Sequence, residues 1–260
     1  MRSIGSVAAR RVASAALLAL AGCQMGRDGF ASPVAAYWRL GLKGDVVVTA
    51  ASQPGTGTKV DLDDDLGVDG EDKWTGRLDV GAGKHRFGLE YLPLRMSGSN
   101  TLGKDIVYHG STYRAGERVF TDLDLTTYAL RWDYAVSQQK RTADVMRLGL
   151  GAWWWKYGSQ VKGSVSGNDE RRTFSHLYPG VNGQWVLDLS KGVTLDLSGA
   201  LAATSADRTI WDVSAGISYM TSDALRATIG YRILTWDYDE STNDGDFALT
   251  GPFAAFTLRF

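Results

Sequence analysis

The densest group of side chains that could bind a cation lies between Asp61 and Asp72. Aspartates at relative positions 1, 3, 5 and 9, with an acid at 12, resemble the ligand pattern of a calcium-binding loop. The sixth position of such a loop requires glycine, but here it is Leu66, and the final acid is aspartate instead of glutamate. We therefore favour a solvated acidic loop, with Asp61, Asp63, Asp65 and Asp69 as weak candidates for metal ligands.

A second set of charged residues recurs at every other position along segments whose remaining positions are apolar. Successive side chains of a strand point to opposite faces, so one face of each segment is charged and the other apolar. A selective pore needs an excess of one sign of charge, whereas here the two signs nearly balance. The pattern predicts a narrow interior in which the charges pair. The predicted lumen charges are Arg39, Lys43, Asp45, Arg77, Asp79, Arg86, Glu90, Arg131, Asp133, Arg147, Asp188, Asp196, Asp212, Arg226, Arg232 and Arg259.

About ten alternating segments carry these charges, each of roughly the length at which a tilted strand crosses a bilayer. They cover residues 38–48, 73–80, 86–91, 128–136, 146–154, 176–188, 193–201, 211–219, 225–233 and 251–260. The connections after the first, third and fifth segments are long and polar, and those after the second, fourth, sixth and eighth are mostly short. This arrangement predicts an all-β fold, a closed antiparallel transmembrane barrel of about ten strands, with eight as an alternative. A soluble exported β-barrel of lipocalin type is the competing interpretation.

The fourth segment contains a break in the alternation. Leu123 and Leu125 have the opposite phase to Tyr128, Leu130 and Trp132. Either a β-bulge or the emergence of the strand from the membrane would explain this slip.

The last strand ends in the pattern Phe256-x-Leu258-x-Phe260, in which alternate residues are apolar and the final residue is aromatic. This pattern resembles the C-terminal assembly signal of Gram-negative outer-membrane β-barrel proteins, although Ala255 stands where that family often has glycine. Together with the strand rhythm, it makes residues 38–260 similar to small outer-membrane barrels such as the OmpA transmembrane domain, OmpX and OmpW. The resemblance implies insertion by the barrel-assembly machinery, contact with membrane lipid and lipopolysaccharide, and no cofactor.

The N-terminal region is predicted to direct export. Three arginines precede the apolar run 12–21, which is about half as long as a membrane-spanning helix. The sequence Leu20-Ala21-Gly22-Cys23 then resembles the lipobox of bacterial lipoproteins, which predicts a signal peptide over residues 1–22 and lipidation of Cys23. Residues 23–37 would then hold the anchor and a short tether. The alternative is ordinary signal cleavage after residue 21, with Cys23 incidental.

Composition narrows the class of function. The formal net charge is −1, which argues against nucleic acid as a partner. The chain has a single cysteine and so cannot form an internal disulfide. No apolar run after residue 23 is long enough for a spanning helix.

These observations favour a bacterial outer-membrane barrel with a structural or surface role, a mostly plugged, charge-paired lumen and a periplasmic N-terminus. The first alternative is a narrow, porin-like channel for small solutes. The second is an enzyme, since omptin proteases and lipid A-modifying enzymes share this architecture. The acids predicted at the outer rim are Asp122, Asp124, Asp237 and Asp239, with His176 nearby. The sequence lacks the Asp-x-His pair of the omptins, so we expect no catalytic residues.

Overall fold

The computed structural model describes residues 29–50, 55–138, 144–205, 208–222, 224–240 and 243–260. The predicted signal peptide and Cys23 lie outside these ranges. Within the described part, no helix combines the length and the hydropathy needed to cross a membrane.

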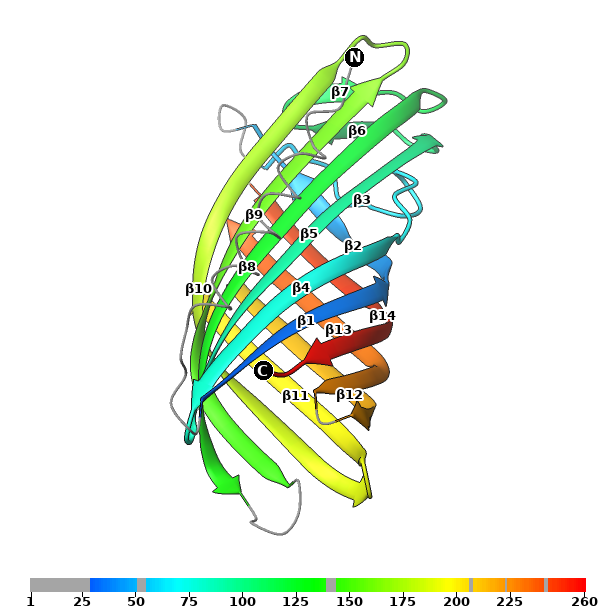
Figure 1. The fold of residues 1–260 in the computed structure, drawn as a ribbon. Helices are drawn as coiled ribbons and strands as arrows, with labels where there is room; N and C mark the ends of the chain where they lie inside the picture. Colours follow the sequence, from blue (N-terminus) through cyan, green and yellow to red (C-terminus); the bar gives the residue numbers. More distant parts are fainter. Residues whose placement is uncertain (1–28, 51–54, 139–143, 206–207, 223, 241–242) are drawn as a thin grey trace, which may run out of the picture.

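The described residues form a closed, ten-stranded antiparallel β-barrel, which confirms the predicted fold class (Figure 1). Consecutive wall strands pair with one another, and the first strand pairs with the last to close the wall. The wall strands are β1 (Gly29–Arg39), β4 (Asp72–Ala82), β5 (His85–Thr101), β8 (Arg118–Gln138), β9 (Val145–Gly163), β10 (Asp169–Ser190), β11 (Val193–Ser205), β12 (Arg208–Ser222), β13 (Leu225–Glu240) and β14 (Asn243–Leu258). Strand β2 (Gly41–Val48) follows β1 after Leu40 and also pairs with β14.

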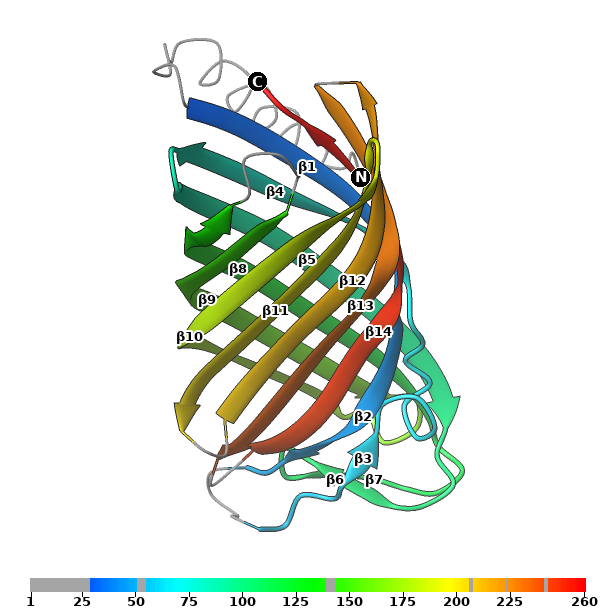
Figure 2. The ribbon, with the colours of Figure 1, turned by 90° about the horizontal axis from the view of Figure 1, so that it is seen from below.

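The barrel has two unlike ends (Figure 2). The turn end carries the connections β4–β5, β8–β9, β10–β11 and β12–β13, together with the start of β1 and the end of β14. The loop end carries the described segments 55–71 and 102–117, which contain β3 (Val60–Asp61), β6 (Ile106–Tyr108) and β7 (Ser111–Tyr113). Strands β6 and β7 form a hairpin whose two turn residues, His109 and Gly110, have φ values of 51° and 87°. Positive φ at both positions is what a tight two-residue hairpin turn requires.

One part of the wall is not closed by a long strand. Strand β2 pairs with β14 on one side, but its other edge pairs only with the short β3. Beyond it, Val68 forms a single bridge with Gly98 of β5. We call the halves of the barrel nearer these two ends the turn half and the loop half. In the loop half, the segment 55–71 therefore fills the gap between β2 and β5.

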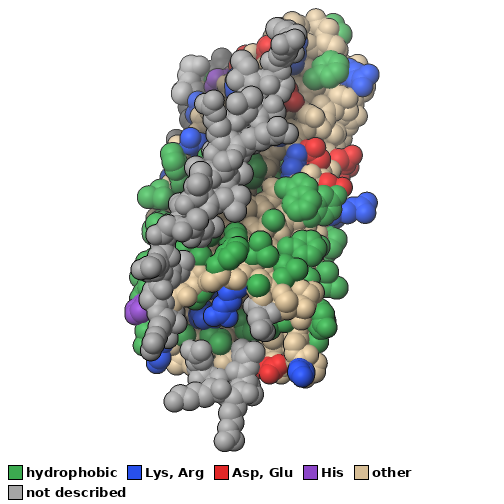
Figure 3. Space-filling model, in the orientation of Figure 1, with side chains coloured by type: hydrophobic (Ala, Val, Ile, Leu, Met, Phe, Trp, Pro, Cys, Tyr) green, Lys and Arg blue, Asp and Glu red, His purple; other side chains and the backbone are tan. Residues whose placement is uncertain are grey.

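The wall strands are longer than a membrane crossing requires. Strand β8 has 21 residues and β10 has 22, about twice the number that a tilted strand needs to cross a bilayer. The turn half presents an outward apolar band, which includes Leu89, Leu130, Leu150, Ile229 and Phe256, all more than half exposed. Figure 3 shows hydrophobic side chains gathered over this half of the visible face.

In the loop half the two faces exchange character. The inward residues are apolar and form the loop-half core, whereas the outward residues include exposed charges. On β8, Leu123 and Leu125 point inward in the same phase as Arg131, and the pairing with β9 shifts only near the turn end, between Ala135 and Ser137. The bulge suggested for the slip at Leu123 is therefore wrong. The strand continues without a bulge, and what changes is that its inner face becomes apolar.

Two predicted boundaries also differ from the structure. Strand β1 begins at Gly29, so residues 29–37, predicted as a tether, belong to the wall. The polar stretch 159–172, part of the long connection predicted after the fifth segment, is mostly strand, and only residues 164–168 connect β9 to β10. Polar outward residues are compatible with a strand once it has left the apolar surroundings of the band.

Candidate functional site

A cavity of about 560 Å³ occupies the turn half of the barrel interior, and we call it the turn-end cavity. Its lining reaches the turn end through Phe30, Val145 and Leu225, and it stops at Trp38 and Phe253 beneath the loop-half core. Strand alternation places charged side chains on this inner face. The charged residues that line it are Arg77, Asp79, Arg86, Glu90, Arg131, Asp133, Arg147, Asp196, Asp212, Arg226, Arg232 and Arg259.

Arg232 is at the centre of the buried charges. Its Nε and Nη2 donate to the two carboxylate oxygens of Asp212 at 2.8 and 2.7 Å, and its Nη1 lies 2.8 Å from Glu90 Oε1. Glu90 also accepts from Arg131 Nη2 at 2.8 Å. The guanidinium of Arg232 lies over the ring of Trp38, 5.2 Å from its centroid, at the boundary with the loop-half core. Bidentate pairs of this kind hold the side chains in fixed positions.

A second buried group surrounds Asp133. Arg86 donates to Asp133 Oδ2 from Nε at 2.8 Å and from Nη2 at 2.6 Å, and to Gln184 Oε1 at 2.6 Å. Asn182 donates to the other oxygen of Asp133. The lining also contains two looser pairs: Arg77 with Asp79 at 3.2 Å and Arg226 with Asp196 at 3.7 Å.

Four predicted lumen charges lie elsewhere. Arg39 and Lys43 are exposed on the outer face, because Trp38, Leu40 and Leu42 point inward. Asp45 pairs with Lys59 at 3.0 Å in the loop half, and Asp188 is exposed at the turn end. The error in the first strand arose because its apolar residues were assigned to lipid. They belong to the loop half, where the apolar face is the inner one.

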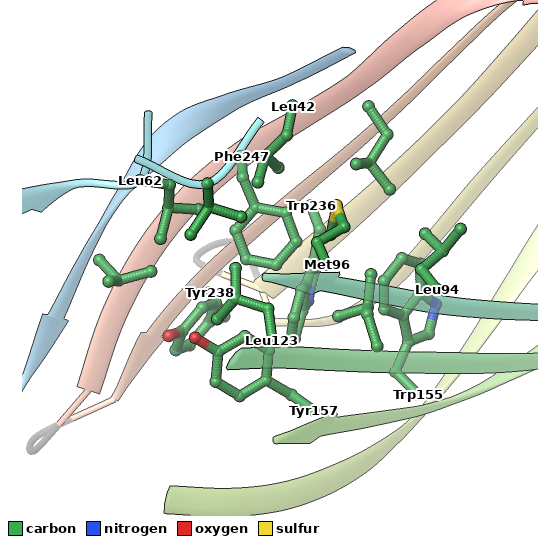
Figure 4. Packing of buried hydrophobic residues seen from close by; sticks show 14 of the residues in the cluster. Leu42, Leu62, Leu94, Met96, Leu123, Trp155, Tyr157, Trp236, Tyr238 and Phe247 are labelled. Atoms are coloured by element: carbon green, nitrogen blue, oxygen red, sulfur yellow. The ribbon is translucent and has the colours of Figure 1, made fainter. Parts of the chain in front are cut away.

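The loop-half core fills the interior above the cavity with aromatic rings (Figure 4). Trp236 is 1% exposed, and its ring centroid lies 4.9 Å from Trp155 and 4.7 Å from Phe247. Its Nε1 donates to Tyr178 Oη at 2.9 Å. Further rings stack around it, among them Tyr157 against Phe174 at 4.7 Å. This core was not predicted from the sequence. Its only signal was the phase reversal on the fourth segment.

The β6–β7 hairpin covers the core at the loop end. Tyr108 and Tyr113 are buried, and their hydroxyl groups bond to Ser159 and to the carbonyl oxygen of Val161 on β9. On the opposite side, the backbone N–H of His109 donates to the carbonyl of Val48 at 2.9 Å. The hairpin is therefore fixed to both β2 and β9, and the lining of the turn-end cavity does not extend past Trp38 into the rings that the hairpin covers.

In the acidic loop, Asp61 makes hydrogen bonds within the loop and Asp65 makes an ion pair outside it. Asp61 Oδ1 accepts the backbone N–H groups of Asp63 and Asp64 at 2.9 and 2.7 Å, and Asp65 Oδ2 pairs with Lys104 at 2.7 Å. Desolvation, followed by the neighbouring Asp69 carboxylate, raises the pKa of Asp63. Leu62 and Leu66 insert into the loop-half core. In the described part of the chain, no three His, Cys, Asp or Glu side chains are placed to hold one metal ion.

The residues proposed for an enzyme do not converge. Asp122, Asp124, Asp237 and Asp239 are exposed on the outer face, whereas His176 points inward. A different trio does meet at the loop end: Ser111 Oγ donates to Glu170 Oε1 at 2.6 Å, and His109 Nδ1 lies 3.0 Å from Glu170 Oε2. The carboxylate stands between the other two, so the histidine does not contact the serine hydroxyl. This order fits an anchor for the hairpin rather than an activated nucleophile, for which the base must contact the serine.

Glu117, between β7 and β8, joins two loops at the loop end. Its Oε1 accepts the backbone N–H groups of Ser166 and Val165 at 2.7 and 2.9 Å, and the Ser166 hydroxyl at 2.8 Å. These hydrogen bonds, that from the Ser166 backbone first, lower the pKa of Glu117 to about 2.

The Glu117 contact predicts a pH dependence of the loops. Because the folded-state pKa lies below the ordinary value of about 4.3, the contact stabilises the loops above that value and is lost as the pH falls towards 2. We expect Glu117→Gln to speed hydrogen exchange at the Val165 and Ser166 amides at about pH 6, and the difference from wild type to be much smaller at about pH 2. Exchange rates corrected for intrinsic pH dependence measure this, with the exposed Glu71→Gln as control. An equal difference at both pH values would contradict it.

Comparisons with known proteins agree with this architecture. No protein-family model and no curated protein sequence matches the chain. Among solved structures, the outer membrane protease OmpT from Escherichia coli superposes with a TM-score of 0.57 at 11% identity, covering 92% of this chain and 99% of that chain. Ail, the attachment invasion locus protein of Yersinia pestis, gives a TM-score of 0.40 at 9% identity, covering 90% of this chain and 99% of that chain. At 11% identity, the likeness to OmpT shows the fold alone.

Proposed function

We propose that this chain is a bacterial outer-membrane β-barrel protein with a structural or surface role and a lumen that does not conduct. The outward apolar band supports the membrane location, since contiguous apolar surface of this extent is rare on soluble proteins. The turn end faces the periplasm and the loop end faces the exterior, as short turns and long loops are distributed in such barrels. Cys23 carries a lipid anchor, and the barrel-assembly machinery inserts the chain through the signal at Phe256, Leu258 and Phe260.

The packing of the loop-half core is the observation that supports a lumen that does not conduct. Trp38, Trp155 and Trp236 are each 1% exposed and lie between the turn-end cavity and the loop end. A hydrated ion would have to displace packed aromatic rings to pass, which costs both packing contacts and ion hydration. The charged turn half alone would suit a narrow channel, but the core above it blocks the path.

Conductance tests this proposal. We expect the full mature chain, inserted into planar bilayers, to give no unitary channel events. Heat-modifiable gel mobility of the same preparation shows that the barrel is folded, and membrane fractionation of expressing cells tests the location. Regular conductance steps from a folded, inserted sample would overturn the closed lumen and support the channel alternative.

We place the surface role at the loop end of the barrel. The segments 55–71 and 102–117 are fixed to the wall by the hairpin contacts and by Glu117, so they present an ordered surface. Acidic side chains of 61–72 lie on that surface, where divalent ions can bridge them to lipopolysaccharide. The separation of Ser111 from His109 by Glu170 gives no support to a hydrolase.

A further inference from the structure

The charges of the turn-end cavity do not fully cancel. Seven arginines and five carboxylates line it. Each carboxylate makes an ion pair, and together the five engage Arg77, Arg86, Arg131, Arg226 and Arg232. Arg147 and Arg259 remain, and neither has a carboxylate within 4.0 Å among the residues that the structure describes. Among the described lining residues, the cavity therefore has two more arginines than carboxylates.

Arg147 is held in this position by the wall. It lies on the inner face of β9, opposite Gln184 of β10. Its Nε is buried and has no hydrogen-bond partner in the described part of the protein. The positive charges of Arg86 and Arg259 act on the Arg147 guanidinium, and the two carboxylates that also act on it, Asp133 and Asp79, are paired with other arginines. A buried donor without an acceptor is costly, so the position favours an anionic ligand.

Arg259 stands at the mouth of the same cavity. Its backbone N–H donates to the carbonyl of Ala224 at 2.9 Å, which fixes the chain at this point. Its guanidinium lies over the ring of Phe30, 5.2 Å from the centroid, and its side chain is exposed to solvent. The arginine therefore lines the cavity and also meets solvent at the turn end.

We propose that the turn-end cavity binds a small anion bearing a phosphate group, which Arg147 and Arg259 hold. Two guanidinium groups match the double charge of a phosphate monoester, and the planar fork of arginine suits phosphate oxygens. The volume of about 560 Å³ exceeds what a phosphate alone needs and lies in the range of pockets for small organic ligands. Gln184, Ser198 and Ser214 also line the cavity and offer hydrogen bonds to a polar organic body. This inference goes beyond the surface role and does not depend on whether the lumen conducts.

Calorimetric titration of the full, refolded chain tests the site. The ligands are inorganic phosphate and glycerol 3-phosphate, at low ionic strength in a zwitterionic detergent. We expect one binding event with glycerol 3-phosphate, weakened about tenfold or more by Arg147→Gln and by Arg259→Gln, as the loss of a charge-assisted hydrogen bond implies. Arg147→Lys keeps the charge and should weaken binding less. The matched control is Arg95→Gln, an exposed arginine in the loop half, which should bind as wild type does.

A third titrant, short-chain phosphatidylglycerol below its micellar concentration, distinguishes a lipid headgroup from a free solute. Binding of this lipid alone, sensitive to Arg147→Gln, would identify the source as lipid and support the anion site. Absence of binding by all three compounds, or binding that Arg147→Gln and Arg259→Gln leave unchanged, would overturn the proposal. Heat-modifiable mobility verifies that each variant is folded. Conductance in planar bilayers is measured separately, so failure of the anion site and failure of the closed lumen give different results.

Discussion

Replacement of Arg232 by methionine should destabilise the barrel by about 3–5 kcal/mol, the usual cost of removing one partner from a buried ion pair. Arg232 is the shared partner of Glu90 and Asp212, both buried. Without it, Asp212 has no other ion-pair partner in the described residues, and Glu90 keeps only Arg131. Urea unfolding of the barrel in phospholipid vesicles, followed by tryptophan fluorescence, measures the change.

Two further variants show whether buried charge causes that loss. Arg95→Met removes an arginine that is 82% exposed and pairs with Asp124 at 3.3 Å, so it should cost about 1 kcal/mol or less. The double variant Arg232→Met with Asp212→Asn removes the uncompensated carboxylate and should recover part of the stability. If Arg232→Met unfolds at the same urea concentration as Arg95→Met, the ion pairs do not carry the stability assigned to them.

Replacement of Trp236 by alanine should cost about 3–5 kcal/mol, as expected when a large buried aromatic residue is truncated. Trp236 contacts Trp155 and Phe247, and its removal also deletes the hydrogen bond that its Nε1 donates to the Tyr178 hydroxyl. The same unfolding measurement applies. The wall itself keeps all its backbone hydrogen bonds, so the variant should still form a closed barrel with heat-modifiable mobility.

The matched control for Trp236 is Trp211→Ala. Trp211 lies on the neighbouring strand β12, but its side chain points outward and is 52% exposed. Its loss leaves no internal cavity, so the destabilisation should be clearly smaller. An equal loss from both variants would mean that the loop-half core contributes no more than an outward-facing ring.

The turn half was predictable because one rule governs it. Strand alternation assigns Leu148 and Leu150 outward and Arg147 inward, and the structure agrees for these residues. Lipid on the outside and charge on the inside give the alternation a strong contrast along the whole crossing. The number of strands, the short turns and the antiparallel order all follow from it.

The loop half could not be predicted in the same way, because its apolar face is the inner one. The apolar residues Leu40 and Leu42 were assigned to the lipid, which placed Arg39 and Lys43 in the lumen. Where a strand leaves the bilayer, its outer face meets water instead of lipid. The apolar residues of the alternation then point inward, and the polar residues point outward. The sequence contains the reversal at Leu123, but periodicity alone does not tell a bulge from a change of surroundings.

Contacts between distant residues also escaped the sequence analysis. Ser111 and Glu170 are 59 positions apart, and Glu117 meets Ser166 across 49 positions. Neither set forms a local motif. Such contacts depend on how the hairpin folds over the barrel, and the lengths of the loops do not determine that.

The ion pair between Arg232 and Glu90 joins opposite walls of the barrel. Strands β13 and β5 are separated by five strands along one side of the wall and by three along the other. Barrel diameter grows with strand number, so one additional hairpin would move these walls farther apart than the pair could span. The ion pair between Arg232 and Glu90 therefore favours one barrel diameter, and buried charge helps to determine the number of strands.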